Sequence, residues 1–219
     1  MQAVLGNKWW GMVLMSLTDK AAIDPAADPT SVDVKTNLCE EERILLRRLA
    51  YEAVAYGLLH GRHLPVNVAR YPPPLREPGA SFVTLKLHGE LRGCIGSLEA
   101  HRPLAEDVAH NAYAAAFADP RFPPLTDHEL TEVDFHLSIL SPAVPMSFNS
   151  EADLLRQLRP GIDGLILEDG IHRGTFLPSV WESLPDAAQF FQQLKRKAGL
   201  PTDHWSSTLK VARYTCESF

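Results

Sequence analysis

Several stretches of the chain carry apolar residues at the spacing of an amphipathic helix. The first begins near Asn37, where Asn37 and Glu40 resemble a capping box, and Gly61 is expected to end it. The second opens at Pro103, because proline is tolerated in the first helical turn. The spacing predicts helices over residues 37–59, 103–118, 153–158 and 186–198.

Other stretches alternate between apolar and polar residues or form short apolar runs, as β-strands do. They predict strands over residues 82–87, 91–98, 133–140, 165–167, 174–177 and 209–215. Helices and hairpins follow one another without a regular βαβ rhythm. We therefore expect an α+β fold with largely antiparallel sheets covered by helices.

The strands over 82–87 and 91–98 are expected to form a hairpin whose register follows from their apolar positions. A three-residue turn at 88–90 keeps the apolar residues of both strands on one face, whereas a two-residue turn would break that match. The predicted pairs are Val83–Ile95 and Leu87–Leu91 on the apolar face, and Thr84–Cys94 and Lys86–Arg92 on the polar face.

The polar face of this hairpin is the first candidate for chemistry. Lys86 and Arg92 are cations beside the Cys94 thiol, and such neighbours favour the thiolate, which is the nucleophile. Together with Thr84, they would also attract a carboxylate or phosphate group. The alternative is that Cys94 is a small buried apolar residue and that Arg92 merely pairs with an acid.

Two further features supply candidates for binding a substrate. Gly93 and Gly96 interrupt the second strand, and glycine in a strand marks a bulge or a close approach to the backbone. Asp119 and Arg121 flank a proline after the second helix, so a rigid loop presents both charges. We expect these four residues to line a substrate site, although a helix stop would also explain the loop.

Composition and charge exclude several classes of protein. The chain has 219 residues, 27 acidic against 21 basic residues, and a formal net charge of −6, which gives no basis for binding nucleic acid. Three scattered cysteines suit a reducing cytoplasm, and neither they nor the nine histidines are spaced as metal ligands or a disulfide framework. We expect a cytoplasmic protein without a metal or another cofactor.

The amino-terminal residues differ in pattern from the rest of the chain. The uncharged stretch over 9–18 is too short to span a membrane and is a poor match to a signal peptide. Asp24-Pro25 and Asp28-Pro29 are typical of a linker. We expect residues 1–36 to be a flexible extension or the product of a misplaced start, and residues 37–219 to form a single domain.

The segment Leu91-Arg92-Gly93-Cys94-Ile95-Gly96 resembles the signature hexapeptide of the AMMECR domain family. The similarity continues through four further segments and covers about 37–219. These segments are Ala115–Leu125, Leu137–Pro142, Gly161–Leu167 and Gly174–Pro178, followed by Lys197–Leu200 and Trp205. The chain is accordingly similar to the bacterial members called AmmeMemoRadiSam system protein A.

The resemblance implies a domain of two interleaved lobes, one larger and one smaller, with a cleft at the Leu-Arg-Gly-Cys-Ile-Gly segment. It also implies two partners, a Memo-type protein and a radical S-adenosylmethionine protein. It implies no particular reaction.

Two hypotheses of function follow. In the first, the protein is an enzyme or enzyme component that acts on a small anionic organic molecule, with Cys94 and Arg92 as catalytic residues. Lys86, Thr84, Gly93, Gly96, Asp119 and Arg121 would then bind the substrate. In the second, the protein is a binding or adaptor module that uses the hairpin as its recognition surface.

Overall fold

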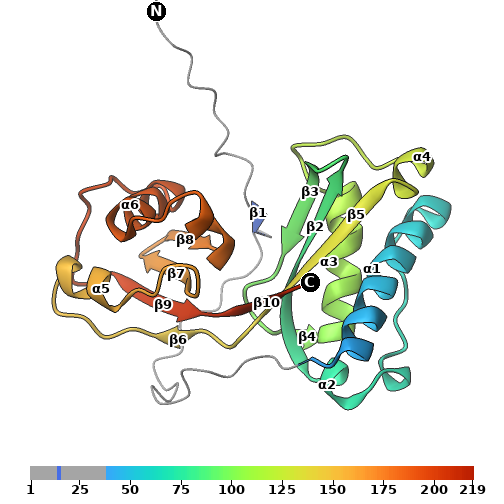
Figure 1. Ribbon diagram of the computed structural model, residues 1–219, viewed down its shortest axis with the longest axis horizontal. Helices are drawn as coiled ribbons and strands as arrows, with labels where there is room; N and C mark the ends of the chain where they lie inside the picture. Colours follow the sequence, from blue (N-terminus) through green and yellow to red (C-terminus); the bar gives the residue numbers. More distant parts are fainter. Residues whose placement is uncertain (1–13, 16–37) are drawn as a thin grey trace, which may run out of the picture. The chain divides into compact units, whose positions relative to one another are not determined.

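The computed structural model describes residues 14–15 and 38–219, and these fall into two compact units (Figure 1). The described part of the first unit comprises residues 14–15, Leu38–Ile139 and Ser218–Phe219, and that of the second comprises Leu140–Glu217. The expected extension over 1–36 lies outside the described residues, apart from Leu14–Met15, and so does Asn37.

A six-stranded sheet, formed mainly by the first unit, has the strand order β1-β3-β2-β5-β10, and its sixth strand, β4, pairs with β2. β2 pairs antiparallel with β3 and β4, whereas β1 runs parallel to β3. The strands are β1 (Leu14–Met15), β2 (Pro78–Leu87), β3 (Glu90–Gly96), β4 (Arg102–Pro103), β5 (Val133–Leu140) and β10 (Cys216–Ser218).

Helices lie against one face of this sheet. The two long ones, α1 (Glu40–His60) and α3 (Leu104–Phe117), pack against each other, and α3 also packs on β2 and β3 (Figure 1). Their shared core contains buried aliphatic residues such as Leu46, Val83 and Leu137, each worth about 1.5–3 kcal/mol when removed from water. Two single-turn helices, α2 (Pro73–Arg76) and α4 (Asp127–Leu130), complete the α-helices described in this unit, together with the 3-10 turn η1 (Val68–Arg70).

The ends of α1 show one agreement and one difference from the predicted pattern. Gly61 ends the helix in the left-handed region, with φ of 63°, as expected. The amino-terminal cap is Cys39 and not Asn37, because the carboxylate of Glu42 accepts the backbone N–H of Cys39 at 2.8 Å. The predicted capping box is therefore two residues out of place.

The second unit has an antiparallel sheet of its own, with the order β6-β9-β7-β8. Trp181 stacks on Phe190 at 3.8 Å between ring centroids in its core, and the indole N–H donates to the carbonyl of Asp163. The elements are β6 (Val144–Pro145), α5 (Glu151–Gln157), β7 (Gly164–Asp169), β8 (His172–Phe176), η2 (Pro178–Glu182), α6 (Ala187–Lys197) and β9 (Lys210–Tyr214). The predicted α+β class with largely antiparallel sheets is confirmed.

The turn between β2 and β3 corrects the predicted hairpin. It has two residues, His88 and Gly89, with φ of 53° and 83°, and Leu87 faces Glu90. Two positive φ values suit the right-handed twist of the flanking strands, which favours so short a turn. The predicted pairs Leu87–Leu91 and Lys86–Arg92 are therefore wrong.

A β-bulge restores the predicted register farther along the hairpin. Leu85 faces Gly93 and Lys86 faces Leu91, so Arg92 is an extra residue on β3. The bulge makes up for the shorter turn. Beyond it the predicted pairs Val83–Ile95 and Thr84–Cys94 are confirmed.

Candidate functional site

Cys94 lies in β3 on the face opposite the helices. Its side chain is buried, with only 4% of the residue exposed, and its Sγ lies 3.2 Å from the hydroxyl oxygen of Thr84 on the neighbouring strand. Either atom can donate in this hydrogen bond. The hydroxyl is thus in position to donate to a thiolate at Cys94, which would stabilise the charged form.

A carboxylate and a guanidinium hold the backbone on both sides of Cys94. Asp119 accepts the backbone N–H of Cys94 at 2.9 Å, and Nη2 of Arg121 donates to the carbonyl oxygen of Cys94 at 3.1 Å. Arg121 also binds Asp119 in a fork, with Nε and Nη2 at 2.9 and 2.6 Å from the two carboxylate oxygens. We call this arrangement the Cys94 clamp; it brings together two predicted site residues, Asp119 and Arg121, at the predicted cysteine.

The electrostatics of the clamp keep both of its charges in place. Burial raises the pKa of Asp119, but the hydrogen bonds from Arg121 and from the Cys94 amide outweigh this effect and bring the pKa below its usual value. The hydrogen bond to Asp119 raises the pKa of Arg121 in turn. The clamp is therefore an ion pair throughout the physiological range.

Arg92 binds a different acid, which the sequence did not identify. Its Nε and Nη2 donate to the carboxylate of Glu129 in α4 at 2.6 and 3.1 Å. This contact lowers the pKa of Glu129 to about 2. The same carboxylate accepts the backbone N–H and the hydroxyl of Thr126, so Glu129 also caps α4.

One nitrogen of Arg92 has no partner in the part of the chain that the structure describes. Arg92 is 8% exposed, and its Nη1 is buried without a hydrogen bond to any residue that the structure describes. Buried donors are almost always paired, so an exception calls for an explanation, such as a bound water, ion or ligand. The guanidinium carbons of Arg92 and Arg121 lie 5.9 and 5.5 Å from the ring centroid of Phe122, so this ring links Arg92 to the Cys94 clamp.

The space beside each of the two glycines in the signature segment is occupied by other atoms of the protein. A Cβ on Gly93 would lie 2.1 Å from the backbone oxygen of Ala115 in α3, and a Cβ on Gly96 would lie 2.1 Å from the ring of Phe82. Close packing inside the first unit therefore explains both glycines. These internal neighbours give no sign that a partner or ligand approaches the backbone at either glycine.

Lys86 does not pair with Arg92 as predicted. It faces Leu91 across the hairpin, and its ammonium contributes, after burial, to the lowered pKa of His136 on β5. The structure shows that Arg121 contacts Cys94, at its carbonyl oxygen. Sequence spacing could not show this, because Arg121 is 27 residues away along the chain.

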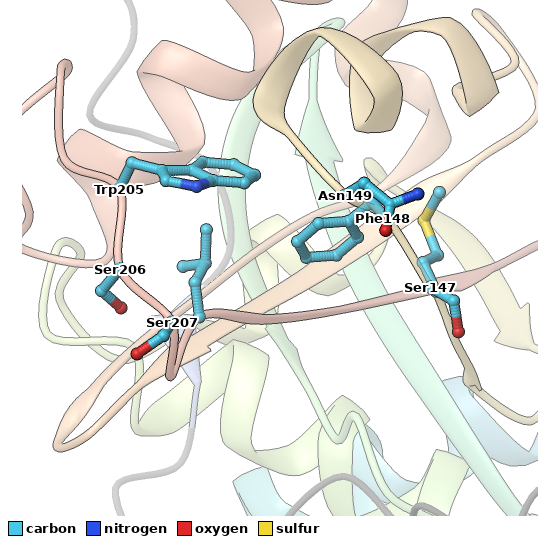
Figure 2. A pocket seen from close by; sticks show the side chains of 8 residues that line it. Ser147, Phe148, Asn149, Trp205, Ser206 and Ser207 are labelled. Atoms are coloured by element: carbon cyan, nitrogen blue, oxygen red, sulfur yellow. The ribbon is translucent and has the colours of Figure 1, made fainter.

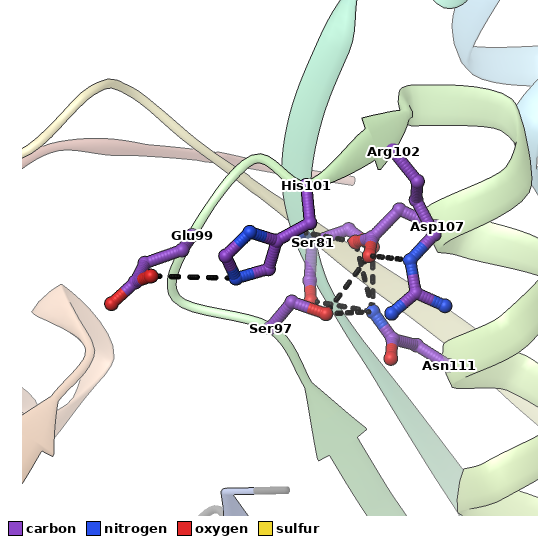
Figure 3. Close-up of polar contacts among 7 residues, drawn as sticks. All are labelled: Ser81, Ser97, Glu99, His101, Arg102, Asp107 and Asn111. Carbon is purple, nitrogen blue, oxygen red and sulfur yellow. Dashed lines mark hydrogen bonds and ion pairs between the residues drawn. The ribbon is translucent and has the colours of Figure 1, made fainter. Parts of the chain in front are cut away.

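A second polar cluster was not predicted from the sequence (Figure 3). The buried carboxylate of Asp107 in α3 accepts hydrogen bonds from the backbone and hydroxyl of Ser81, from the hydroxyl of Ser97 and from the amide of Asn111, all between 2.7 and 2.9 Å. Burial raises its pKa. A signal was present in the sequence: Asp107 and Asn111 are polar residues four apart, so they share one face of an alanine-rich helix.

The Asp107 cluster ties both strands of the hairpin to α3, since Ser81 lies in β2 and Ser97 follows β3. Satisfied buried networks of this kind make a region rigid. Among residues 38–219 no three His, Cys, Asp or Glu side chains converge as a metal site would require. The described helices also include none with the length and apolar character needed to cross a membrane.

Comparisons with known proteins give a family match that spans most of the chain. The model of a protein family described as AMMECR1 matches residues 47–219, which include every residue of the Cys94 clamp and the Arg92–Glu129 pair. The chain belongs to the AMMECR1 family. Relatives include a protein of Thermofilum pendens, 40% identical over 200 residues, which covers 83% of this chain and 91% of the relative.

Two other AMMECR1 comparisons extend the result to a second organism and to a solved structure. A protein of Methanothermobacter thermautotrophicus is 40% identical over 188 residues. The match covers 82% of this chain and 94% of that protein. The crystal structure of an uncharacterized protein from Pyrococcus horikoshii has a TM-score of 0.76 and 34% identity, over 83% of this chain and 92% of that one. The relatives compared are archaeal, and their names state no activity.

Proposed function

We propose that this AMMECR1 protein is an enzyme or enzyme component that acts on a small anionic organic molecule, with the Cys94 thiol as its reacting group. The observation that carries the proposal is the buried Nη1 of Arg92, which has no hydrogen-bond partner among residues 38–219 and lies in a cluster that also holds the clamped cysteine. Leaving such a donor unpaired costs about 1–3 kcal/mol or more, and an anionic group of a substrate would recover that energy.

Each residue of the cluster has a distinct part in this proposal. The Cys94 clamp holds the backbone so that the thiol and the Thr84 hydroxyl keep a fixed geometry, and fixed geometry is what a reacting group needs. Arg92 binds the substrate through Nη1 alone, because Glu129 occupies the other two nitrogens. The anion is then recognised by directed hydrogen bonds and not by excess positive charge.

The protein works, in this proposal, as protein A of a bacterial AmmeMemoRadiSam system. Its partners are a Memo-type protein and a radical S-adenosylmethionine protein. Support comes from membership of the AMMECR1 family together with the signature segment at Leu91–Gly96.

The decisive experiment replaces Cys94 in a reconstituted system of the three components. Cys94→Ala should abolish turnover while the fold, followed by circular dichroism, is retained. The double variant Cys39→Ala with Cys216→Ala is the matched control and should keep full activity. Full turnover by Cys94→Ala would end the proposal.

The anion site is tested separately with Arg92→Lys, which keeps the charge but loses the fork. It should raise KM for the anionic substrate at least about tenfold, because one hydrogen bond to a charged group is lost. Unchanged KM would show that Nη1 of Arg92 does not touch the substrate.

A second candidate function has its own support. Glu129 and Asp119 neutralise the guanidinium groups of Arg92 and Arg121, and the two glycines serve internal packing. Both observations are compatible with a rigid recognition surface that performs no chemistry. The protein would then be a non-catalytic binding or adaptor module that docks a partner through the β2–β3 hairpin. In that case Cys94→Ala is neutral, whereas His88→Ala with Glu90→Ala at the exposed tip abolishes a pull-down of the Memo-type protein.

Thiol chemistry separates the two candidates directly. The rate of alkylation of Cys94 by iodoacetamide is followed against pH in the variant that lacks Cys39 and Cys216. A midpoint well below about 8.5, the ordinary value for a thiol, supports the enzyme, and a midpoint at or above it supports the module.

A further inference from the structure

The second unit contains a pocket far along the chain from the cysteine and its clamp. It has a volume of about 470 Å³, within the range of small-molecule sites, and is lined by residues 146–149, 205–207 and Leu209 (Figure 2). Strand pairing brings these segments together: Pro145 faces Ala212, and the backbone N–H of Met146 donates to the carbonyl of Val211.

One carboxylate orders the wall that carries Trp205. Asp169 at the end of β7 binds His204, Ser206 and Thr208 through side-chain contacts of 2.5–2.7 Å. The hydroxyl contacts from Thr208 and Ser206, with His204, lower the pKa of Asp169 to about 2, so the carboxylate is charged. Every second residue from 204 to 208 is thus bound to Asp169. The residues that alternate with them, Trp205, Ser207 and Leu209, line the pocket.

The opposite wall is anchored as well. Gln157 of α5 donates to the carbonyl of Ser147, and the backbone N–H of Asn149 donates to Asp153. Both walls are therefore ordered before any ligand arrives, which lowers the entropy lost on binding.

Part of the aromatic surface of the pocket is exposed to solvent. Trp205 is 39% exposed, and its ring centroid lies 5.6 Å from that of Phe148, at 58° between the ring planes. Figure 2 shows the two rings reaching the hollow from different segments. An ordered, exposed indole offers a stacking surface for a flat ring.

The charges around the pocket disfavour an ionic ligand. None of the lining residues is charged. The Lys195 ammonium, held by Glu151 and the carbonyl of Thr202, lies 5.9 Å from the Trp205 ring centroid and opposes a second cation over that ring. The charged Asp169 behind Ser206 opposes an anion.

The polar groups at the rim have hydrogen-bonding capacity to spare. The side chains of Ser147, Asn149 and Ser207 make no hydrogen bond with the described residues. An amide and a hydroxyl together match an edge that both donates and accepts.

We propose that this pocket binds an uncharged small molecule with a flat nitrogen-containing ring, such as a nucleobase or nucleoside. The ring stacks on Trp205, and its polar edge bonds to Asn149 and Ser207. The pocket shares no residue with the Cys94 clamp, and its test does not depend on turnover.

The test is ligand-observed saturation-transfer NMR on the full chain, with adenosine and uridine as probes. Saturation should reach the base protons of both. Trp205→Ala should weaken binding at least about fivefold, as loss of one base–aromatic stack does. Ile171→Ala, an exposed site on the β7–β8 turn, is the matched control and should bind as the wild type does.

Asn149→Leu keeps the indole but removes the amide, so it guards against a general effect of losing Trp205; it should also weaken binding. Glucose and benzyltrimethylammonium test the ring chemistry, and neither should bind. Any of three results overturns the proposal. The first is no saturation transfer to either nucleoside at about 10 mM, a concentration that would load a millimolar site. The others are unchanged nucleoside binding by a folded Trp205→Ala variant, and binding of glucose or the cation in preference to both nucleosides.

Discussion

At Arg92, two guanidinium nitrogens bind Glu129 and the third has no partner among the described residues. The pairing of a nine-tenths buried cation with a partly exposed acid makes Glu129 important for stability. Asp119 pairs with Arg121 in the same way. In the folded protein the pKa of each acid lies below its ordinary value, so the stability of the protein depends on pH through both groups.

Glu129→Gln should lower the free energy of unfolding by about 2 kcal/mol at pH 7, because a hydrogen-bonded charge pair loses its acid. The pKa of Glu129 is about 2 in the folded protein against an ordinary 4.5. Since the folded value is the lower one, the stabilisation is complete above about pH 4.5 and is lost as the pH falls towards 2. Urea unfolding at a series of pH values measures this.

The difference between wild type and Glu129→Gln should therefore shrink below pH 4.5. Glu132→Gln, an exposed acid in the same region, is the control and should show little difference at any pH. A gap for Glu129→Gln that stays constant down to pH 2.5 would contradict the strength of the Arg92 contact.

At the scale of elements, the β2–β3 hairpin is fixed by three devices: a two-residue turn, a bulge at Arg92, and the Asp107 cluster that ties it to α3. The glycines permit the closest contacts. At Gly93 the neighbour is the backbone of α3, whereas at Gly96 it is the side chain of Phe82. These two kinds of neighbour respond differently to an added methyl group.

Gly93→Ala should destabilise the protein by about 3 kcal/mol, because a helix backbone cannot move aside for a Cβ. Gly96→Ala should also destabilise it, but Phe82→Leu in the same chain should recover part of the loss by freeing space. Thermal unfolding of the single and double variants measures this coupling. Recovery of Gly93→Ala by Phe82→Leu, or none for Gly96→Ala, would contradict the packing described.

At the scale of the whole molecule, the net charge is −6, and the two arginines near the cysteine are paired with carboxylates. Arg92 pairs with Glu129 and Arg121 with Asp119, whereas Lys86 faces Leu91 across the hairpin. The positive patch suggested by sequence is thus largely neutralised by acids brought from later in the chain.

The whole chain should accordingly not bind a labelled single-stranded RNA at 150 mM salt, beyond the nonspecific range of about 10⁻⁴–10⁻⁶ M. Fluorescence anisotropy measures this, with a basic RNA-binding protein as the positive control. Tight binding that weakens steeply with added salt would show a basic face that the charge balance conceals.

The sequence by itself determined the class of fold, the long helices and much of the sheet, because these follow from periodic burial of apolar residues over local distances. It also determined the family signature, the candidate cysteine and its pairing with Thr84. The resemblance over 37–219 rests on the same residues that the family match includes from 47 onwards.

Only the tertiary structure decided which charges meet. Glu129 at Arg92, Arg121 at Cys94 and the serine donors around Asp107 come from segments between 10 and 37 residues apart. No local pattern encodes such pairings, since they depend on how the helices pack on the sheet. The two-residue turn and the bulge also escaped prediction, because an inserted residue in one strand compensates for a missing one in the turn and leaves the apolar pattern nearly unchanged.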